Sequence, residues 1–173
     1  MTRHSRRREP RRGLTKGVLD YDENVAVGYT PVDDDLYREI ILDHFRNPRY
    51  KHAVEPADRS VEANNPLCGD EIDLSLRMNS DGIEAIGFEG RGCSISQASA
   101  SMLCEAVTGM DVASATSLAE RFRAMLQGGD STDMGDLEAL QGVRAYPVRI
   151  KCATLAWSAL LQALQGPSAE EAK

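Results

Sequence analysis

Several kinds of segment are missing from this 173-residue sequence, and each absence narrows what the chain can be. It has no run of about 18 apolar residues, the length needed to span a bilayer, so no membrane partner is expected. Its first residues contain no apolar stretch like that of a secretory signal, which favours a reducing, cytoplasmic location. No Cys-x-x-Cys pair occurs, so the paired knuckles of a zinc ribbon are excluded.

The composition is that of one folded domain with a charged start. Hydrophobic residues make up 42% of the chain and charged residues 27%, which suits a single compact core. The net charge of −7 is unevenly distributed. The first 12 residues hold six arginines and one glutamate, a net of +5, so the rest of the chain carries −12. An acidic body of this kind is not expected to bind nucleic acid.

Three regions follow from the pattern of apolar residues. Residues 1–32 show neither a helical nor a strand period, so this basic extension is expected to be a disordered, solvated tail, with binding to an anionic surface as the alternative. Residues 33–166 are expected to form the folded domain. Residues 167–173 follow a Gly-Pro pair and should be a frayed tail.

The first half of the domain predicts one helix and a small antiparallel sheet. Three aspartates precede an apolar pattern that favours a helix over 36–45. A short strand over 60–63 is followed by strict apolar–polar alternation over 71–78, which is typical of a half-buried strand. The Asn-Ser-Asp-Gly turn at 79–82 has hairpin chemistry, so residues 83–89 should return antiparallel.

The second half predicts helices. A small-residue-rich helix is expected over 94–107, Asp111 should cap the next one, and a short helix at 136–140 should stop at Gly142. The last helix is expected over 152–164. Together these elements predict an α+β fold in which a small antiparallel sheet packs against several helices.

Four cysteines are the main candidates for chemistry. In a reducing compartment, metal binding or catalysis is favoured over disulfides. The predicted hairpin returns Cys93 to the end of the sheet where Cys68 and Asp70 lie. Cys152, at the start of the last helical pattern, would join them. Cys104 lies three turns inside an apolar stripe and is expected to be a core residue.

A set of three thiolates and one carboxylate favours tetrahedral zinc. The predicted ligands are Cys68, Asp70, Cys93 and Cys152. Such a site would carry a net charge of −2, so Arg149 and Lys151 are candidates to offset it. The zinc could equally serve only to staple strand ends to helix starts.

The histidines are not expected to be ligands. No second histidine or cysteine lies three or four residues after His44 or His52, so they are interpreted as ordinary helix-end and loop residues.

Three motifs in the expected order resemble the SufU family, a branch of the IscU/NifU-N-terminal-like proteins of iron–sulfur cluster assembly. They are Asn-Asn-Pro-Leu-Cys-Gly-Asp at 64–70, Phe-Glu-Gly-Arg-Gly-Cys-Ser-Ile-Ser-Gln-Ala-Ser-Ala-Ser-Met at 88–102, and Tyr-Pro-Val-Arg-Ile-Lys-Cys-Ala-Thr-Leu at 146–155. The resemblance covers residues 36–164, and the basic extension lies outside it.

The resemblance implies an IscU-like (SufE/NifU-like) fold and zinc bound by Cys68, Asp70, Cys93 and Cys152. It implies a sulfurtransferase that accepts persulfide sulfur on Cys68 from a SufS-type cysteine desulfurase and passes it to a downstream iron–sulfur scaffold or acceptor. A histidine of the desulfurase would replace Cys68 on the zinc. Arg149 matches a family position associated with the desulfurase interface or site.

The alternative implied by the wider family is an IscU-type scaffold for [2Fe–2S] assembly. Scaffolds carry a histidine directly before the last cysteine, where this chain has Lys151, and a Leu-Pro-Pro-Val-Lys motif that is missing here. The segment 127–141 resembles an extra stretch of the SufU branch. These departures favour sulfur transfer over cluster assembly, while a zinc module that only binds a partner is a third possibility.

Overall fold

The computed structural model of the protein describes residues 31–165. The predicted basic extension and frayed tail lie outside this range, except that residues 31 and 32 already belong to the first helix. In chain order the elements are α1 (Pro31–Arg46), β1 (Arg59–Asn65), β2 (Asp70–Asn79), β3 (Gly82–Arg91), α2 (Ser94–Val107), α3 (Val112–Leu126), the 3₁₀ helix η1 (Gly135–Ala145), α4 (Pro147–Ala153) and α5 (Leu155–Gln165).

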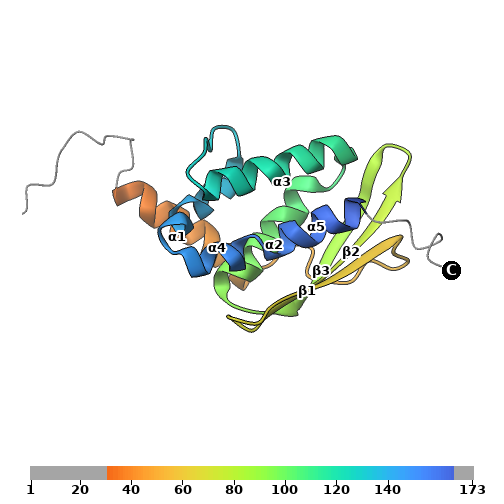
Figure 1. Ribbon diagram of the computed structural model, residues 1–173, viewed down its shortest axis with the longest axis horizontal. Helices are drawn as coiled ribbons and strands as arrows, with labels where there is room; N and C mark the ends of the chain where they lie inside the picture. Colours follow the sequence, from red (N-terminus) through yellow and green to blue (C-terminus); the bar gives the residue numbers. More distant parts are fainter. Residues whose placement is uncertain (1–30, 166–173) are drawn as a thin grey trace, which may run out of the picture.

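A three-stranded antiparallel sheet in the order β1-β2-β3 forms one side of the molecule (Figure 1). Register pairs Val61 with Leu74 and Leu74 with Phe88. The side chains that alternate inward along β2 are buried, because α2 and α5 pack against that face of the sheet. The α+β architecture predicted from the sequence is therefore confirmed.

The tight turn between β2 and β3 is confirmed. The Asn79 side-chain oxygen accepts the N–H groups of Asp81 and Gly82 at 2.8 and 2.9 Å, an Asx-type turn. Gly82 has a φ of 144°, which favours glycine. This hairpin sends β3 back alongside β2, so that Arg91 pairs with Glu71 at the end of the hairpin farthest from the turn.

The helical predictions hold in part. The helix Ser94–Val107 and the Asp111 cap of α3 are as predicted. The short helix was wrong in length, because η1 is a 3₁₀ helix that continues past Gly142 to Ala145. The single last helix was also wrong, because the structure has two, α4 and α5, separated at Thr154.

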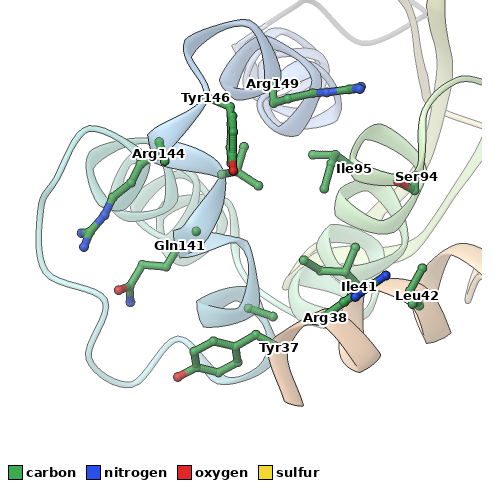
Figure 2. A pocket seen from close by; sticks show the side chains of 14 residues that line it. Tyr37, Arg38, Ile41, Leu42, Ser94, Ile95, Gln141, Arg144, Tyr146 and Arg149 are labelled. Atoms are coloured by element: carbon green, nitrogen blue, oxygen red, sulfur yellow. The ribbon is translucent and has the colours of Figure 1, made fainter. Parts of the chain in front are cut away.

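A groove of about 970 Å³ lies where α1, the first turn of α2, η1 and α4 meet. Figure 2 shows Tyr146 and Ile95 facing this space from opposite sides, with Ile41 of α1 nearby. The groove begins directly beside Cys93, since Ser94 is part of its lining.

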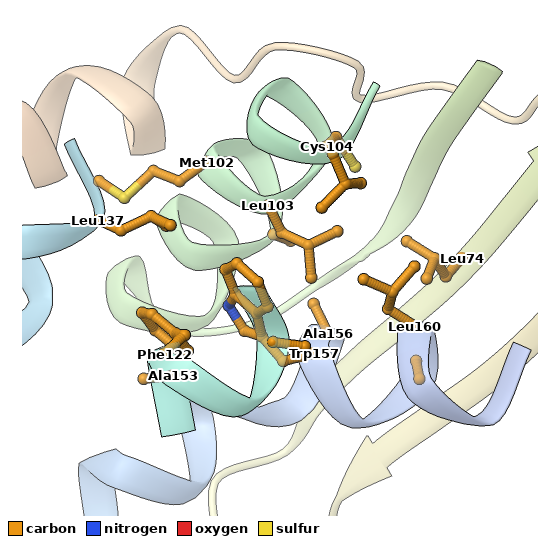
Figure 3. Packing of buried hydrophobic residues seen from close by; sticks show 14 of the residues in the cluster. Leu74, Met102, Leu103, Cys104, Phe122, Leu137, Ala153, Ala156, Trp157 and Leu160 are labelled. Carbon is orange, nitrogen blue, oxygen red and sulfur yellow. The ribbon is translucent and has the colours of Figure 1, made fainter. Parts of the chain in front are cut away.

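The core lies between the sheet and the helices (Figure 3). Trp157 of α5 stacks on Phe122 of α3 with ring centroids 4.3 Å apart, and its indole N–H donates to Ser99 at 3.0 Å. Cys104 is fully buried in this core, as predicted, and burial raises the pKa of its thiol. Over residues 31–165, no helix combines the length and apolar character needed to cross a bilayer.

Candidate metal centre

The candidate metal centre lies at the end of the sheet opposite the β2–β3 turn. Cys68 belongs to the turn between β1 and β2, Asp70 is the first residue of β2, and Cys93 caps the N-terminus of α2. The predicted convergence of these three segments follows from the hairpin register, which brings the end of β3 beside the start of β2.

Asn65 shapes the turn that presents Cys68. Its backbone oxygen accepts the N–H groups of Cys68 and Gly69 at 3.1 and 2.9 Å, and its side-chain oxygen accepts the Leu67 N–H at 3.3 Å. Gly69 has a φ of 69°, a left-handed conformation that suits glycine. Cys68 is half-exposed at this turn, and its neighbour Leu67 is 70% exposed.

Asp70 ties the turn to α2. Its carboxylate is fully buried and accepts the backbone N–H of Cys93 at 2.8 Å. The Cys93 Sγ atom lies 3.7 Å from the other carboxylate oxygen. Cys93 Sγ also accepts the Ser96 N–H at 3.4 Å, so the thiol is the side-chain cap of α2. A helix N-terminus favours a negatively charged group at this position.

Two glycines before Cys93 allow this close packing for different reasons. Gly90 has a φ of 126°, and a side chain there would meet the Glu71 backbone oxygen. At Gly92, a Cβ atom would lie only 2.6 Å from Asp70 Oδ1. An unusual backbone angle is thus found at Gly90, whereas Gly92 is needed for space.

Cys152 reaches the same point from α4. It lies near the end of this short helix instead of at the start of the last one, because the helix already begins at Pro147, whose ring suits the first helical position. Its Sγ atom is 3.1 Å from the Cys68 Sγ and 3.7 Å from the Asn65 side-chain nitrogen, which donates to it. Burial, followed by the adjacent Asp70 and Cys68, raises the pKa of this thiol.

Arg149 places a cation beside the sulfur atoms of Cys93 and Cys152. The Cys93 side chain, followed by that of Cys152, raises the pKa of this exposed guanidinium, so one turn of α4 presents both a thiol and a counter-charge. Lys151, the other candidate, is exposed, and the structure gives it no side-chain contact with the cysteines in the part of the chain that it describes.

The donor atoms fit a metal ion. Potential ligand atoms of Cys68, Asp70 and Cys152 lie within 4.8 Å of one another, and Cys93 adjoins them through Asp70. Tetrahedral zinc would place two thiolates about 3.8 Å apart and a thiolate about 3.5 Å from a carboxylate oxygen. The observed distances of 3.1 and 3.7 Å need only small shifts to match, whereas Cys93 lies outside the 4.8 Å group and would have to move closer to at least one of the other donors. Thiol and carboxylate side chains converge in this partly buried space, and a bound cation would offset the charge of the thiolates that coordinate it.

Asn65 is a site residue that sequence reasoning missed. Asparagine before proline was interpreted only as part of a turn, but it is the last residue of β1 and only 7% exposed. The sequence contains no signal for its contact with Cys152, because the two residues are 87 positions apart.

Comparison with known proteins agrees with this arrangement. Residues 36–166 match the model of the NifU-like N terminal domain. The chain is 51% identical over 130 residues to the zinc-dependent sulfurtransferase SufU of Bacillus subtilis, covering 73% of this chain and 88% of the relative. It is 41% identical over 133 residues to the iron–sulfur cluster assembly scaffold protein IscU of Streptococcus pyogenes, covering 75% and 83%.

A solved structure agrees as well. The crystal structure of a candidate scaffold protein for the SUF system from Fervidobacterium islandicum matches with a TM-score of 0.70 and 32% identity, over 73% of this chain and 95% of that one. The chain therefore belongs to the family of NifU-like N-terminal domains, which includes relatives named SufU and IscU.

Proposed function

We propose that the protein is a zinc-dependent sulfurtransferase of iron–sulfur cluster assembly. Its zinc ligands would be Cys68, Asp70, Cys93 and Cys152, and Cys68 would be the sulfur acceptor. Support comes from the sulfur-rich donor set and from the 51% identity to a relative named as such an enzyme. The sulfur donor would be a SufS-type cysteine desulfurase in the cytoplasm, and the receiver a downstream iron–sulfur scaffold or other acceptor.

The observation that carries the proposal is a difference among the three thiols. Cys93 accepts an N–H bond from Ser96, and Cys152 accepts one from Asn65. Cys68 accepts no N–H bond within residues 31–165; its contact is with the Cys152 sulfur. Cys68 is therefore the thiol that the fold holds least. It also stands at a half-exposed turn, where an incoming persulfide can reach it, whereas Cys152 is buried.

The transfer step is a thiol–disulfide type of exchange. The Cys68 thiolate attacks the outer sulfur of the desulfurase persulfide. A new S–S bond forms at Cys68 while the S–S bond of the donor breaks, and the donor cysteine leaves as a thiolate. No external oxidant or reductant is needed, because the outer sulfur only changes its partner.

Bound zinc would keep the cysteine ligands deprotonated at neutral pH. The chain's own residues position the sulfur atoms and the cation. The turn built on Asn65 and Gly69 presents Cys68 outward, while Cys93 and Cys152 stay attached to α2 and α4. Arg149 would act at the desulfurase interface or site, where its exposed guanidinium beside Cys93 can meet an incoming anionic persulfide.

A scaffold for [2Fe–2S] assembly is the second candidate, because relatives at 41% and 37% identity are named IscU scaffold proteins. It would use the same four ligands with iron in place of zinc. The exposed Lys151 in the position before Cys152 argues against it, since a lysine there adds no ligand.

The test measures alanine and sulfide production by a SufS-type desulfurase with added wild-type protein or the Cys68→Ala variant. We expect the wild type to stimulate turnover and to gain about 32 Da per transferred sulfur on Cys68, while Cys68→Ala does neither. Cys104→Ala is the matched control, because this thiol is buried away from the site. Normal stimulation by Cys68→Ala would overturn the assignment of the acceptor.

A further inference from the structure

His44 occupies an unexpected environment in the last turn of α1. The sequence predicts an ordinary helix-end histidine, because no second ligand lies three or four residues away. In the fold, however, the residue is only 1% exposed and lies where α1 packs against α2 and η1. Groups distant in the sequence therefore surround it.

One side of the His44 ring is fixed and the other is open. Its Nδ1 atom lies 2.9 Å from Ser101 Oγ, and that hydroxyl also accepts the Arg49 backbone N–H at 2.8 Å. Within residues 31–165, the buried Nε2 atom has no partner at hydrogen-bond distance. Buried polar atoms are paired in the great majority of native structures, so an unpaired ring nitrogen points to a group that completes it.

Two carboxylates converge on this nitrogen. Asp136 Oδ2 of η1 lies 3.6 Å from His44 Nε2, and Glu105 Oε2 of α2 lies 3.9 Å from it. All three side chains line a small cavity of about 240 Å³. The remaining walls of the cavity are formed by Met102, Ala106, Met134, Gly135 and Leu137.

The negative charges at this cavity are not balanced by positive ones. Burial, with the neighbouring Arg49, lowers the pKa of His44, so the ring is neutral near pH 7 and does not offset the two carboxylates. Arg49 Nε lies 3.9 Å from Glu105, but its guanidinium is already engaged with Asp43 at 2.7 Å. A divalent cation between the neutral ring and the carboxylates would bring the cluster to zero net charge.

We propose that His44, Glu105 and Asp136 form a second metal site, which takes a divalent transition ion such as Mn²⁺ or Fe²⁺ through one nitrogen and two carboxylate oxygens. This donor set suits these ions, whereas the thiolate centre suits softer metals. The neutral ring would carry its proton on Nδ1, donating to Ser101 Oγ and leaving the Nε2 lone pair for the metal. An outer hydrogen bond of this kind orients a histidine ligand.

The donor atoms of the proposed site lie farther apart than they would around a bound metal ion. Metal–ligand bonds of about 2.0–2.2 Å bring neighbouring donor atoms to about 3–3.5 Å. Both carboxylates must therefore move inward from 3.6 and 3.9 Å and toward each other, because the three donor atoms do not all lie within 4.8 Å of one another. The Glu105 and Asp136 side chains are 52% and 64% exposed and can do so. Because the three ligands come from α1, α2 and η1, the ion would fasten together the elements that wall the groove of Figure 2.

The test titrates Mn²⁺ into the full chain whose thiolate centre is already loaded with zinc, and follows the loss of the free Mn²⁺ electron paramagnetic resonance signal. Mn²⁺ is the probe because it prefers oxygen and nitrogen donors over thiolates. We expect one Mn²⁺ per chain and a higher melting temperature. Glu105→Gln and Asp136→Asn, both at exposed side chains, should each weaken binding at least tenfold, and His44→Gln should abolish it.

His52→Gln is the matched control, because His52 is exposed and its ring Nδ1 atom lies at hydrogen-bond distance from the backbone oxygen of Ala53, away from the three proposed ligands. This variant should bind Mn²⁺ as the wild type does. The proposal is overturned if the wild type binds no Mn²⁺, or if Glu105→Gln and Asp136→Asn bind it unchanged. Neither result would bear on sulfur transfer at Cys68, which uses other residues.

Discussion

Replacing Gly92 by alanine tests how tightly the predicted ligand Asp70 is held. The added Cβ atom would lie 2.6 Å from Asp70 Oδ1, 3.0 Å from its Cγ and 3.1 Å from its Cβ. Real Cβ contacts almost never fall below 3.0 Å, so the carboxylate must move by at least about 0.4 Å. Asp70 is fully buried beside the Cys93 backbone, so the movement strains its hydrogen bond at 2.8 Å.

The size of the effect follows from that bond. A hydrogen bond to a charged group contributes about 1.5–3 kcal/mol. If most of it is lost, zinc should bind roughly tenfold to a hundredfold more weakly, since each 1.4 kcal/mol is a factor of about ten. We expect Gly92→Ala to fold, to lose zinc to a chelator faster than the wild type, and to stimulate the desulfurase less.

A double-mutant cycle measures whether the effect passes through Asp70. Chelator competition would be compared for wild type, Gly92→Ala, Asp70→Ala and the double variant. Once the Asp70 side chain is removed, the added methyl group has space and should cost little. Gly129→Ala is the control for a steric change elsewhere, because its Cβ would crowd Ala124 in α3. The reasoning is refuted if Gly92→Ala retains zinc like the wild type, or weakens it equally without Asp70.

Three further predictions follow from single contacts. Cys104→Ala should lower the free energy of unfolding by about 1 kcal/mol, because it leaves a small core cavity, and a loss of zinc in this variant would contradict its core assignment. Asn65→Ala removes the N–H donor of Cys152 and one turn contact, so zinc affinity should fall about tenfold by chelator competition; unchanged affinity would remove Asn65 from the site. The lowered pKa of His44 means that the unfolded chain takes up its proton first as the pH falls. Without added divalent ions, stability should therefore drop below about pH 6.5 by urea unfolding, and His44→Gln should flatten this drop; an equal drop in both proteins would refute it.

The sheet and half of the metal centre could be predicted because their signals are local. Alternation along β2 and the Asn79–Gly82 turn chemistry determine an antiparallel hairpin, and the hairpin alone brings Cys93 back to Asp70. The cap of α2 could be predicted for the same reason, since a short polarisable side chain stands directly before a helical pattern.

The rest depends on tertiary contacts that a local pattern does not contain. Cys152 could be chosen as a ligand, but its place near the end of α4 depends on Pro147 starting a helix earlier than the apolar pattern indicates. The donor Asn65 and the carboxylates around His44 come from segments 61 or more positions away from their partners. Periodicity within one element carries no information about such pairs.

The most direct test of the central claim is the metal content and visible spectrum of protein purified without oxygen, followed by its effect on a SufS-type desulfurase. We predict about one zinc per chain, no visible absorption bands and strong stimulation of the desulfurase. Iron with charge-transfer bands in the visible range, and no stimulation, would contradict sulfur transfer and favour a cluster scaffold.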